Sequence, residues 1–593
     1  MTGDQGSAEE QIHHLCAGGV SVVVPSLAHP SPGLPRILHW GADLGDLSAE
    51  ALRELAVVFV AQVTSCVLDD PVPAAVLPEH ALGYSGWPGV SGHRDGRDWS
   101  PLFTVTGVER ALEALVVTGT DEHAALAVEV RLELTPSGLV RVRAALTNAH
   151  TSEPYWVDAA HLALPVPPVA DELLDLAGRH IRERAPQRQP FHVGTRLRES
   201  RRGHGGHDAS LLLVAGTSGF GFRSGEVWGL HVAWSGNHRV YADRLPTGGY
   251  AVLGGGELLL PGELRRALGE TYASPWVVGA YAVDGLDAMS SRIHDYQRAR
   301  PAHPTSSRPV ILNTWEAVYF DQGAEKLLAL ADRAAAIGTE RFVLDDGWFR
   351  GRRHEAAGLG DWFVDEDVWP QGLGPLVEHV RAREQSGLWV EPESVNPDSD
   401  VAHAHPDWIL ATGGRMPPLS RLEQFLDVGN PAVWDYLLER LDALLTEYPI
   451  DFLKWDLNRD IIDGGRSPGG EAAVHRNTEA LYALLDEIRR RHPGVEIESC
   501  AGGGGRIDLG ILERTDRVWG SDTNDPLERQ QIQRWTELLI PPELVGAHVG
   551  AAHAHTTQRT HTVAFAAGDG PVRTLRHGAR PHDDVRARAR RAR

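Results

Sequence analysis

The feature that most constrains this chain is an alternation of apolar strands and helices that begins near residue 305. Helical segments, EKLLALADRAAAIG (325–338), AVWDYLLERLDALLTEY (432–448) and others at about 374–385, 473–491 and 527–538, separate short, almost continuously apolar segments. This spacing indicates parallel βαβ units. The predicted strands are VILNTWE (310–316), RFVLDDGW (341–348), GLWVEPE (387–393), DFLKWD (451–456), VEIESC (495–500), DRVWGSD (516–522) and ELVGAHVG (543–550).

Seven such strands, each ending in polar groups, favour a (β/α)8 TIM barrel over an open sheet. In that fold the carboxyl ends of the strands meet at one face, where active sites form. Indole rings and carboxylates in one pocket suit a sugar, because C–H faces pack on rings and hydroxyls donate to carboxylates. Paired carboxylates are also what retaining glycoside hydrolysis needs. The strand ends supply Trp315, Asp345, Asp346, Trp389, Glu391, Glu393, Lys454, Asp456, Cys500, Asp522 and His548.

Lys454 is unusual in this composition. Among 57 basic residues the chain has two lysines, Lys326 and Lys454. A lysine retained at the end of an apolar strand suggests a site that needs a compact ammonium group rather than a guanidinium fork. The alternative is a solvated strand end without function.

The first half of the chain is β-rich. Up to about residue 290, short alternating apolar segments are interrupted by Gly, Pro and His, and LAVEVRLELTPSGLVRVRAALTN (126–148) predicts two strands around a Pro-Ser-Gly turn. We therefore predict an N-terminal β-sandwich over 1–290, a linker over 291–304 and a catalytic barrel over 305–566.

Composition narrows the class of protein. A net charge of −23 argues against nucleic-acid binding and for a soluble enzyme. The acidic start has no apolar segment of a secretory signal, and no apolar run approaches the ~18 residues of a membrane span. Three widely separated cysteines, Cys16, Cys66 and Cys500, fit a reducing cytoplasm without disulfides.

Three further motifs have less specific interpretations. GGGG (502–505) lacks a following Gly-Lys-Ser/Thr, so we interpret it as a turn that approaches a ligand closely rather than as a phosphate loop. HVGAAHAH (548–555) has metal-like histidine spacing but no accompanying carboxylate or cysteine cluster. RRGHGGHD (201–208) is predicted to be a polar loop. We expect neither a metal nor an organic cofactor.

Over about residues 310–566 the chain resembles the α-galactosidases of glycoside hydrolase family 36. The resemblance rests on ordered motifs, and the β-rich N-terminal half is compatible with the sandwich of that family. The motifs are NTWEAVYF, LDDGWF, GDWFVDEDVWPQGL, GLWVEPESVNPDSD, HPDW, KWDLNR, ESCAGGGGR and WGSDTNDPLER.

The resemblance implies roles for individual residues. Asp456 would be the nucleophile and Asp522 the general acid/base, with a pKa raised by burial or by nearby negative charge. Eight further residues would bind galactose. Asp345 and Asp346 would accept hydrogen bonds from the 4- and 6-hydroxyls of galactose, and Lys454 and Arg421 would bind hydroxyls and keep Asp456 ionised. Trp315 and Trp389 would form walls of the pocket. Cys500 and Gly503 would lie by the 2-hydroxyl and leave no room for an N-acetyl group.

The implied reaction is hydrolysis of terminal α-D-galactosyl residues, as in melibiose or raffinose, by double displacement with retained configuration. An α-galactosyl transferase of the raffinose-synthase type is an open alternative, because it uses the same carboxylates. A carbohydrate-binding remnant without activity is another. Members of the family are often oligomers, so a homo-oligomer is also left open.

Residues 567–593 depart from the family pattern. This segment holds eight arginines and three acidic residues, and we expect neither apolar periodicity nor a strand in it. The barrel would then lack its last strand, and the chain would be poorly soluble or weakly active. We interpret the basic tail as a shifted reading frame, because the codons of residues 568–574, read one nucleotide later, permit a family-like helix. Sequencing of the gene tests this.

Overall fold

The structure of the chain is a computed structural model that describes residues 12–25, 31–58, 65, 68–69, 72, 74–149, 151–208, 211–246, 251–306, 308–568 and 574–577. It divides into two compact units. The first unit comprises residues 1–176, 186–201 and 210–300, and the second comprises 177–185, 202–209 and 301–593. Two short segments of the N-terminal half therefore belong to the second unit, which the predicted boundaries did not foresee.

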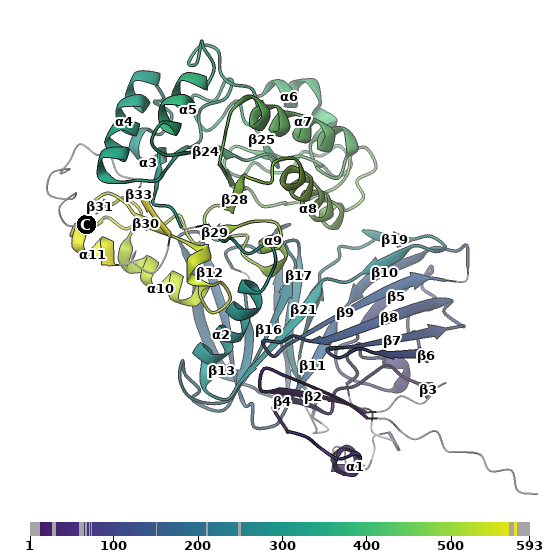
Figure 1. Ribbon diagram of the computed structural model, residues 1–593. Coiled ribbons are helices and arrows are strands. Elements are labelled where there is room, and N and C mark those ends of the chain that lie inside the picture. Colours follow the sequence, from purple (N-terminus) through teal and green to yellow (C-terminus); the bar gives the residue numbers. More distant parts are fainter. Residues whose placement is uncertain are drawn as a thin grey trace, which may run out of the picture. The chain divides into compact units, whose positions relative to one another are not determined.

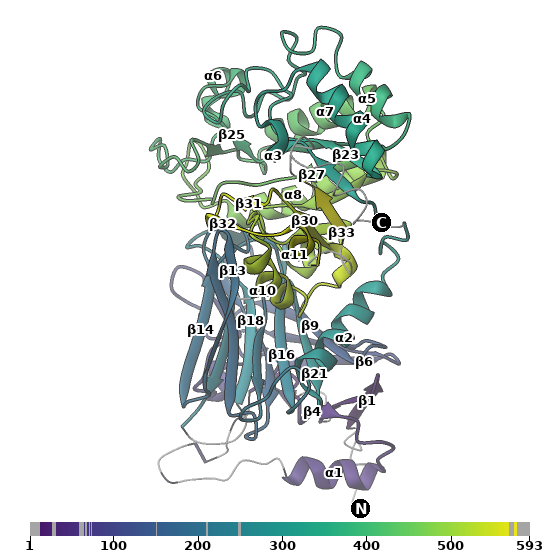
Figure 2. The same ribbon diagram turned by 90° about the vertical axis from the view of Figure 1, so that its left-hand side faces the viewer.

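The first unit is built from antiparallel sheets (Figure 2). One three-stranded sheet contains β1 (His13–Ala17), β2 (Val20–Val24) and β4 (His39–Ala42), and another contains β19 (Leu264–Arg266), β10 (Tyr155–Ala160) and β5 (Val90–His93). A four-stranded sheet contains β11 (Leu162–Val166), β18 (Ala251–Glu257), β17 (His238–Arg244) and β14 (Gly194–Ser200). The 11-stranded sheet contains β13 (Arg182–Pro190), β12 (Glu172–Arg179), β15 (Leu213–Gly216), β16 (Val227–Ala233), β21 (Trp276–Ala282), β9 (Leu139–Asn148), β8 (Leu126–Leu134), β7 (Ala114–Asp121), β6 (Thr104–Arg110), β3 (Ser31–Pro32) and β20 (Thr271–Ala273).

The predicted hairpin at 126–148 is confirmed. β8 and β9 pair along their whole length, and Gly138 in the connecting turn has φ +83°, a conformation that favours glycine. In β8 every second side chain, including Val128, Val130 and Leu132, is buried, as expected of a strand with one face on a core. β16 of the large sheet packs against β18 of the four-stranded sheet, which agrees with the predicted sandwich.

Helix α2 (Gly285–Arg298) corrects the predicted linker. Most of the segment expected to connect the domains at 291–304 is helical. One face of the helix buries Leu286, Met289 and Ile293, so the segment packs as part of the first unit. The helix begins shortly after β21. The predicted domain boundary at residue 290 therefore falls inside the helix and was placed too early.

The second unit contains a closed parallel barrel (Figure 1). All seven predicted strands are confirmed, with most ends trimmed by one to four residues; β23 begins at its predicted residue, and β24 begins two residues earlier than predicted. Ile311, Val343 and Phe452 form a buried apolar cluster on three of these strands. In ring order the strands are β22 (Ile311–Asn313), β23 (Arg341–Leu344), β24 (Gln385–Val390), β27 (Phe452–Trp455), β28 (Glu496–Ser499), β29 (Arg517–Trp519), β30 (Val545–Val549) and β33 (Thr574–His577).

The prediction that the barrel lacks its eighth strand is wrong. β33 lies in the basic tail and pairs in parallel with both β30 and β22, so the ring is closed. Strand formation here does not require an apolar sequence, because two neighbouring strands offer unpaired backbone groups to any extended segment between them. The prediction of poor solubility assumed that β22 and β30 have unpaired edges, and their pairing with β33 removes that assumption. Residues 578–593 lie outside the described residues, and the frameshift hypothesis stays a prediction.

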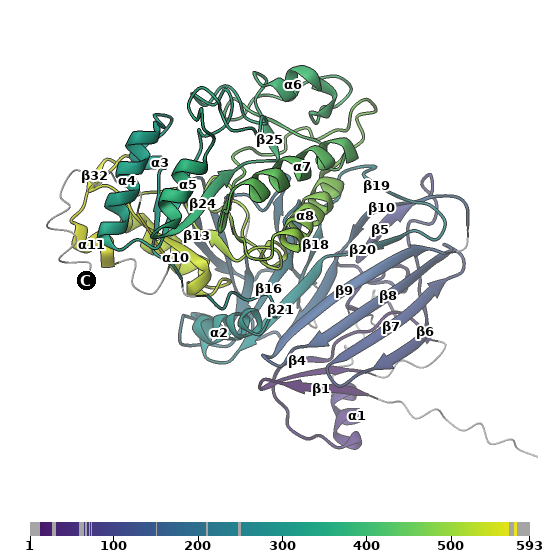
Figure 3. The ribbon, with the colours of Figure 1, turned by 45° about the horizontal axis from the view of Figure 1, so that its top comes forward.

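Helices cover the outside of the barrel (Figures 1 and 3). The predicted helices are confirmed as α4 (Ala324–Ile337), α5 (Gly374–Arg381), α7 (Pro431–Glu447), α8 (Val474–Arg491) and α10 (Pro526–Thr536). The Asn430 and Asp525 side chains cap α7 and α10 by accepting bonds from backbone N–H groups of the first turn. Shorter elements are α1 (Ala49–Val58), α3 (Trp315–Val318), α6 (Asp400–Ala404), α9 (Leu509–Leu512), α11 (Val563–Gly568), β25 (Ser394–Val395), β26 (Gln424–Phe425), β31 (His553–Ala554) and β32 (Arg559–Thr560).

Residues 202–208 contact the loop that follows β27. Arg202 forms ion pairs with Asp208 (2.9 Å) and Asp460 (2.5 Å), and His204 Nε2 lies 2.8 Å from Asp460 Oδ1. The predicted polar loop is therefore polar because it pairs with the barrel. No helix in the described part of the chain is long and apolar enough to span a membrane.

We predict that β33 stabilises the barrel by closing it. A chain that ends at Gly568 leaves β22 and β30 with unpaired edges, and it is expected to unfold about 5 °C or more below a chain that ends at His577 and to aggregate more readily. Thermal unfolding followed by circular dichroism, with light scattering, measures both effects. Equal melting temperatures for the two chains would show that β33 contributes nothing to the stability of the barrel.

Candidate active site

The carboxyl ends of the barrel strands surround one cavity of about 430 Å³. Its size is that of a small-molecule site. β23 ends directly before Asp345, and β27 ends directly before Asp456. Because parallel strands bring these ends to one edge, residues separated by more than 200 positions share the cavity. Eight of the ten predicted site residues line it: Trp315, Asp345, Asp346, Trp389, Arg421, Lys454, Asp456 and Asp522.

Asp456 is buried, with 5% of its surface exposed, and its carboxylate is held in place at both oxygens. Trp389 Nε1–H donates to Oδ2 (3.1 Å). The backbone N–H groups of Leu457 (2.9 Å) and Gly502 (3.4 Å) donate to Oδ1. The carboxylate is thus oriented by three donors from three different strand ends, which is the preorganisation that a nucleophile requires.

Asp345 and Lys454 form a buried ion pair on the floor of the cavity. Lys454 Nζ donates to Asp345 Oδ2 (2.9 Å), and Asn313 Nδ2 donates to the same oxygen (2.5 Å). Both charged side chains are less than 8% exposed. An ion pair at this depth is favourable only with good geometry and further hydrogen bonds, which the neighbouring amide supplies.

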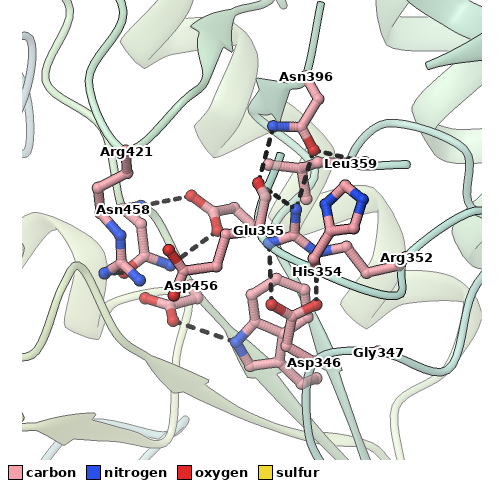
Figure 4. Close-up of polar contacts among 12 residues, drawn as sticks. Asp346, Gly347, Arg352, His354, Glu355, Leu359, Asn396, Arg421, Asp456 and Asn458 are labelled. Atoms are coloured by element: carbon pink, nitrogen blue, oxygen red, sulfur yellow. Dashed lines mark hydrogen bonds and ion pairs between the residues drawn. The ribbon is translucent and has the colours of Figure 1, made fainter. Parts of the chain in front are cut away.

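Asp346 is held by a bidentate arginine (Figure 4). Arg352 donates to its two oxygens through Nε and Nη2, each at 2.9 Å, and through Nη1 to Asn396 Oδ1 (2.9 Å). Burial raises the pKa of Asp346, and the Arg352 charge and hydrogen bonds oppose this effect. The carboxylate plane is therefore fixed by a residue only six positions further along the chain.

Arg421 reaches the cavity from a strained turn. Arg421 and Leu422 have φ values of +52° and +65°, a region that residues other than glycine seldom adopt. Arg421 Nη1 donates to Asn458 Oδ1 (2.8 Å), and Asn458 Nδ2 donates to Glu391 Oε2 (2.7 Å; Figure 4). Burial and the charge of Asp456 raise the pKa of Glu391 to about 7.

Asp522 follows β29 and is partly open to solvent, with 32% of its side chain exposed. Trp519 Nε1–H donates to Oδ1 (3.0 Å), and His180 Nε2 lies 3.3 Å from Oδ2. The expectation of a raised pKa is wrong. Burial acts to raise the pKa of Asp522, but the hydrogen bond from His180 and the nearby positive charges of Lys454 and Arg421 hold it below its ordinary value.

Cys500 and Gly503 support the site from behind its wall. Neither is among the residues that line the described cavity. Cys500 is fully buried, and burial raises the pKa of its thiol. Gly503 has φ +84°, and a Cβ atom there would lie 2.6 Å from the backbone nitrogen of Asp522. Glycine is therefore required by its conformation and by the close approach of two strand-end loops.

Sequence reasoning did not identify several lining residues as part of the site. Ile181 and His180 come from the tip of the hairpin between β12 and β13, and nothing in the sequence of that hairpin indicates the barrel. The others lie close to predicted strand ends, where spacing alone could have suggested them. They are Asn313, Glu316, Tyr319, Phe320, Glu355, Asn458, Trp519, His555 and Thr556, whereas His548 was expected at its strand end.

The histidines of 548–555 have partners other than a metal. His548 Nε2 lies 3.2 Å from Glu316 Oε2, and Asn524 Nδ2 lies 2.7 Å from His555 Nδ1. In the described residues no group of three or more His, Cys, Asp or Glu side chains is arranged to hold a metal ion. The two contacts place these residues in the wall of the cavity.

Comparisons with known proteins connect this geometry to a family. The family model for melibiase matches residues 271–568, and that for the glycosyl hydrolase family 36 N-terminal domain matches residues 33–265. The chain is 41% identical over 532 residues to an α-galactosidase of Escherichia coli, a match that covers 89% of this chain and 74% of that protein. It is 35% identical over 481 residues to a probable α-galactosidase C of Aspergillus flavus, covering 78% and 63%.

Solved structures agree. The crystal structure of the family 36 α-galactosidase AgaA from Geobacillus stearothermophilus superposes with a TM-score of 0.89 at 28% identity, covering 98% of this chain and 85% of that one. An AgaA variant has been solved in complex with raffinose. The sequence matches span about three-quarters of the E. coli protein and less than two thirds of the A. flavus protein. With family models matching both of its halves, this chain belongs to glycoside hydrolase family 36, the family of the melibiase-type α-galactosidases.

Proposed function

We propose that this chain is a retaining α-galactosidase that hydrolyses terminal, non-reducing α-D-galactosyl residues of oligosaccharides such as melibiose and raffinose. The observation that carries the proposal is the presence of two carboxylates, Asp456 and Asp522, in one cavity at the carboxyl ends of barrel strands. Membership of the family and the raffinose complex of a related enzyme support the substrate class.

Asp456 acts as the nucleophile in this proposal. Its oxygens are oriented by the Trp389 indole and two backbone N–H groups, and it is largely shielded from water. It attacks the anomeric carbon while Asp522 protonates the glycosidic oxygen, which gives a β-galactosyl enzyme. Asp522 then removes a proton from water, and the water oxygen displaces Asp456, so galactose leaves with retained α configuration.

The ion-paired carboxylates bind the sugar in this proposal. Asp345 and Asp346 accept hydrogen bonds from galactose hydroxyls, and their partners, Lys454 and Arg352, fix the two carboxylates in place. Trp315 supplies an aromatic wall for the C–H face of the ring. The closed barrel supports an active enzyme over an inactive binding remnant, since the wall at β33 is present.

The nucleophile assignment predicts a large loss of activity in Asp456→Ala. Hydrolysis of p-nitrophenyl α-galactoside should fall by at least about a thousandfold, because no covalent intermediate can form. Asp463→Asn is a matched control, since Asp463 lies in the following loop and pairs with the exposed Arg415. Products of melibiose and raffinose are analysed in parallel: free galactose supports hydrolysis, and longer oligosaccharides indicate the transferase. Undiminished activity of Asp456→Ala would contradict the assignment.

The acid/base assignment predicts a dependence on the leaving group. Asp522→Ala should lose far more activity on melibiose, whose leaving alcohol needs a proton, than on p-nitrophenyl α-galactoside, whose phenolate leaves unaided. Added azide should raise turnover of the aryl substrate, because it replaces water without a general base. Chromatography should show an α-galactosyl azide, because azide displaces Asp456 from the β-galactosyl enzyme with inversion at C1. Equal losses on both substrates, without rescue, would exclude this role for Asp522.

Gly503 is predicted to control the position of Asp522. In Gly503→Ala the Cβ atom meets the Asp522 backbone, and its φ of +84° is strained for alanine, so folding should lose about 1 kcal/mol or more. The activity on melibiose should fall more than that on the aryl substrate, because the acid is displaced. Gly494→Ala, where a Cβ atom meets nothing within 4 Å, is the control. Wild-type stability in Gly503→Ala would contradict the packing argument.

A further inference from the structure

His180 contacts Asp522 from the N-terminal half of the chain. It lies at the tip of the β12–β13 hairpin, in a nine-residue segment that belongs to the barrel unit. Its Nε2 atom is 3.3 Å from Asp522 Oδ2, and half of its side chain is exposed in the cavity. The steps proposed for Asp456 and Asp522 give this histidine no role.

The hairpin tip is firmly anchored beside Asp522. Arg184 donates to the carbonyl oxygens of Gly520 (3.1 Å) and Gly504 (2.6 Å), and Ser521 Oγ donates to Glu183 Oε2 (2.6 Å). Arg184 and Glu183 are both less than 5% exposed. These bonds hold the tip on the two residues that directly precede Asp522, so the His180 contact is built into the fold.

The other neighbour of His180 is a neutral ring. His207 packs edge to face against it, with the ring centroids 5.5 Å apart. Burial lowers the pKa of His207 to about 4, so at neutral pH its Nε2–H donates to the carbonyl oxygen of Gly502 (2.7 Å). A neutral neighbour does not repel a proton on His180.

The charged groups that face His180 favour its protonation. The hydrogen bond with Asp522 raises the pKa of His180, burial opposes it, the charges of Asp522 and Glu183 raise it further, and Arg421 lowers it. Lys454 and Arg421 act on Asp522 in the opposite sense, by favouring its ionised form. Within this pair the resting proton therefore lies on the imidazole.

We propose that His180 is a positioning residue for the acid/base, one that holds a proton for Asp522 and delivers it through Nε2 when the leaving group departs. This inference rests on the proposed function. It explains how a carboxylate surrounded by cations can act as a general acid near neutral pH, because the pair retains one proton where Asp522 alone would be ionised.

The proton balance closes over one turnover. In the first step the Nε2–H bond breaks and the proton passes to Asp522 Oδ2, which protonates the glycosidic oxygen. The C1–O bond breaks with its electron pair on that oxygen, and Asp456 bonds to C1. In the second step water gives a proton to Asp522 and its oxygen bonds to C1, releasing Asp456. Asp522 returns the proton to Nε2, so one water is consumed and both residues are restored.

The test is the pH dependence of kcat/KM for His180→Gln, which retains a hydrogen-bonding side chain without a titratable group. In the wild type the pair keeps its last proton to a pH above the ordinary value of histidine. In the variant Asp522 must hold the proton alone, beside Lys454 and Arg421. The alkaline limb for melibiose should therefore move to lower pH by about one unit or more. The profile for p-nitrophenyl α-galactoside should change much less.

A purely structural role would give a different result, namely a uniform loss on both substrates with unchanged limbs, and that outcome would overturn the proposal. His403→Gln is the control, because His403 is exposed on α6 and does not line the cavity. The pair can also be tested without turnover. In ¹³C-histidine NMR, Asp522→Asn should lower the pKa of His180. An unchanged pKa of His180 would refute the pairing. Because this measurement does not require release of galactose, it distinguishes failure of the pairing from failure of the proposed function.

Discussion

The closed parallel ladder of the barrel is the constraint on which the rest of the site depends. Each strand presents its carboxyl end to the same edge, so the residue that follows it must point into or beside one cavity. Asp345 after β23 and Asp456 after β27 are separated by more than 100 residues, yet both line it. The ladder therefore sets the relative positions of the carboxylates before any side chain contact does.

The inside of the barrel is charged as well as apolar. Arg517 Nε lies 2.8 Å from Glu498 Oε2, and Arg341 Nη2 lies 2.7 Å from Glu496 Oε2. The Arg341 guanidinium also packs over the Phe452 ring at 4.5 Å. Buried ion pairs contribute little net stability, and removing one partner is costly. They tie β23, β28 and β29 together below the strand ends that carry the side chains of the cavity.

Where the sequence predicted the structure, the signal was local. Each apolar run between 310 and 550 overlaps its strand, because a strand buried on both faces is rich in apolar residues. β33 was missed because Thr574–His577 has only one apolar residue, and its neighbours rather than its composition make it a strand. His180 was missed for a related reason: its position depends on Arg184 contacting loops more than 300 residues away. Such contacts leave no trace in the spacing of either segment.

The surroundings of Asp456 and Asp522, rather than their residue type, support the different functions proposed for them. Asp456 is enclosed and bonded to an indole and two backbone N–H groups, none of which acts as an acid or a base near neutral pH. Asp522 is partly exposed and contacts an imidazole that is itself half exposed. A nucleophile must stay ionised and fixed in place, whereas an acid/base must gain and lose a proton in every cycle. Among the described residues, His180 gives Asp522 a partner through which such a proton can pass, and this contact supports the proposal that Asp456 attacks and Asp522 transfers protons.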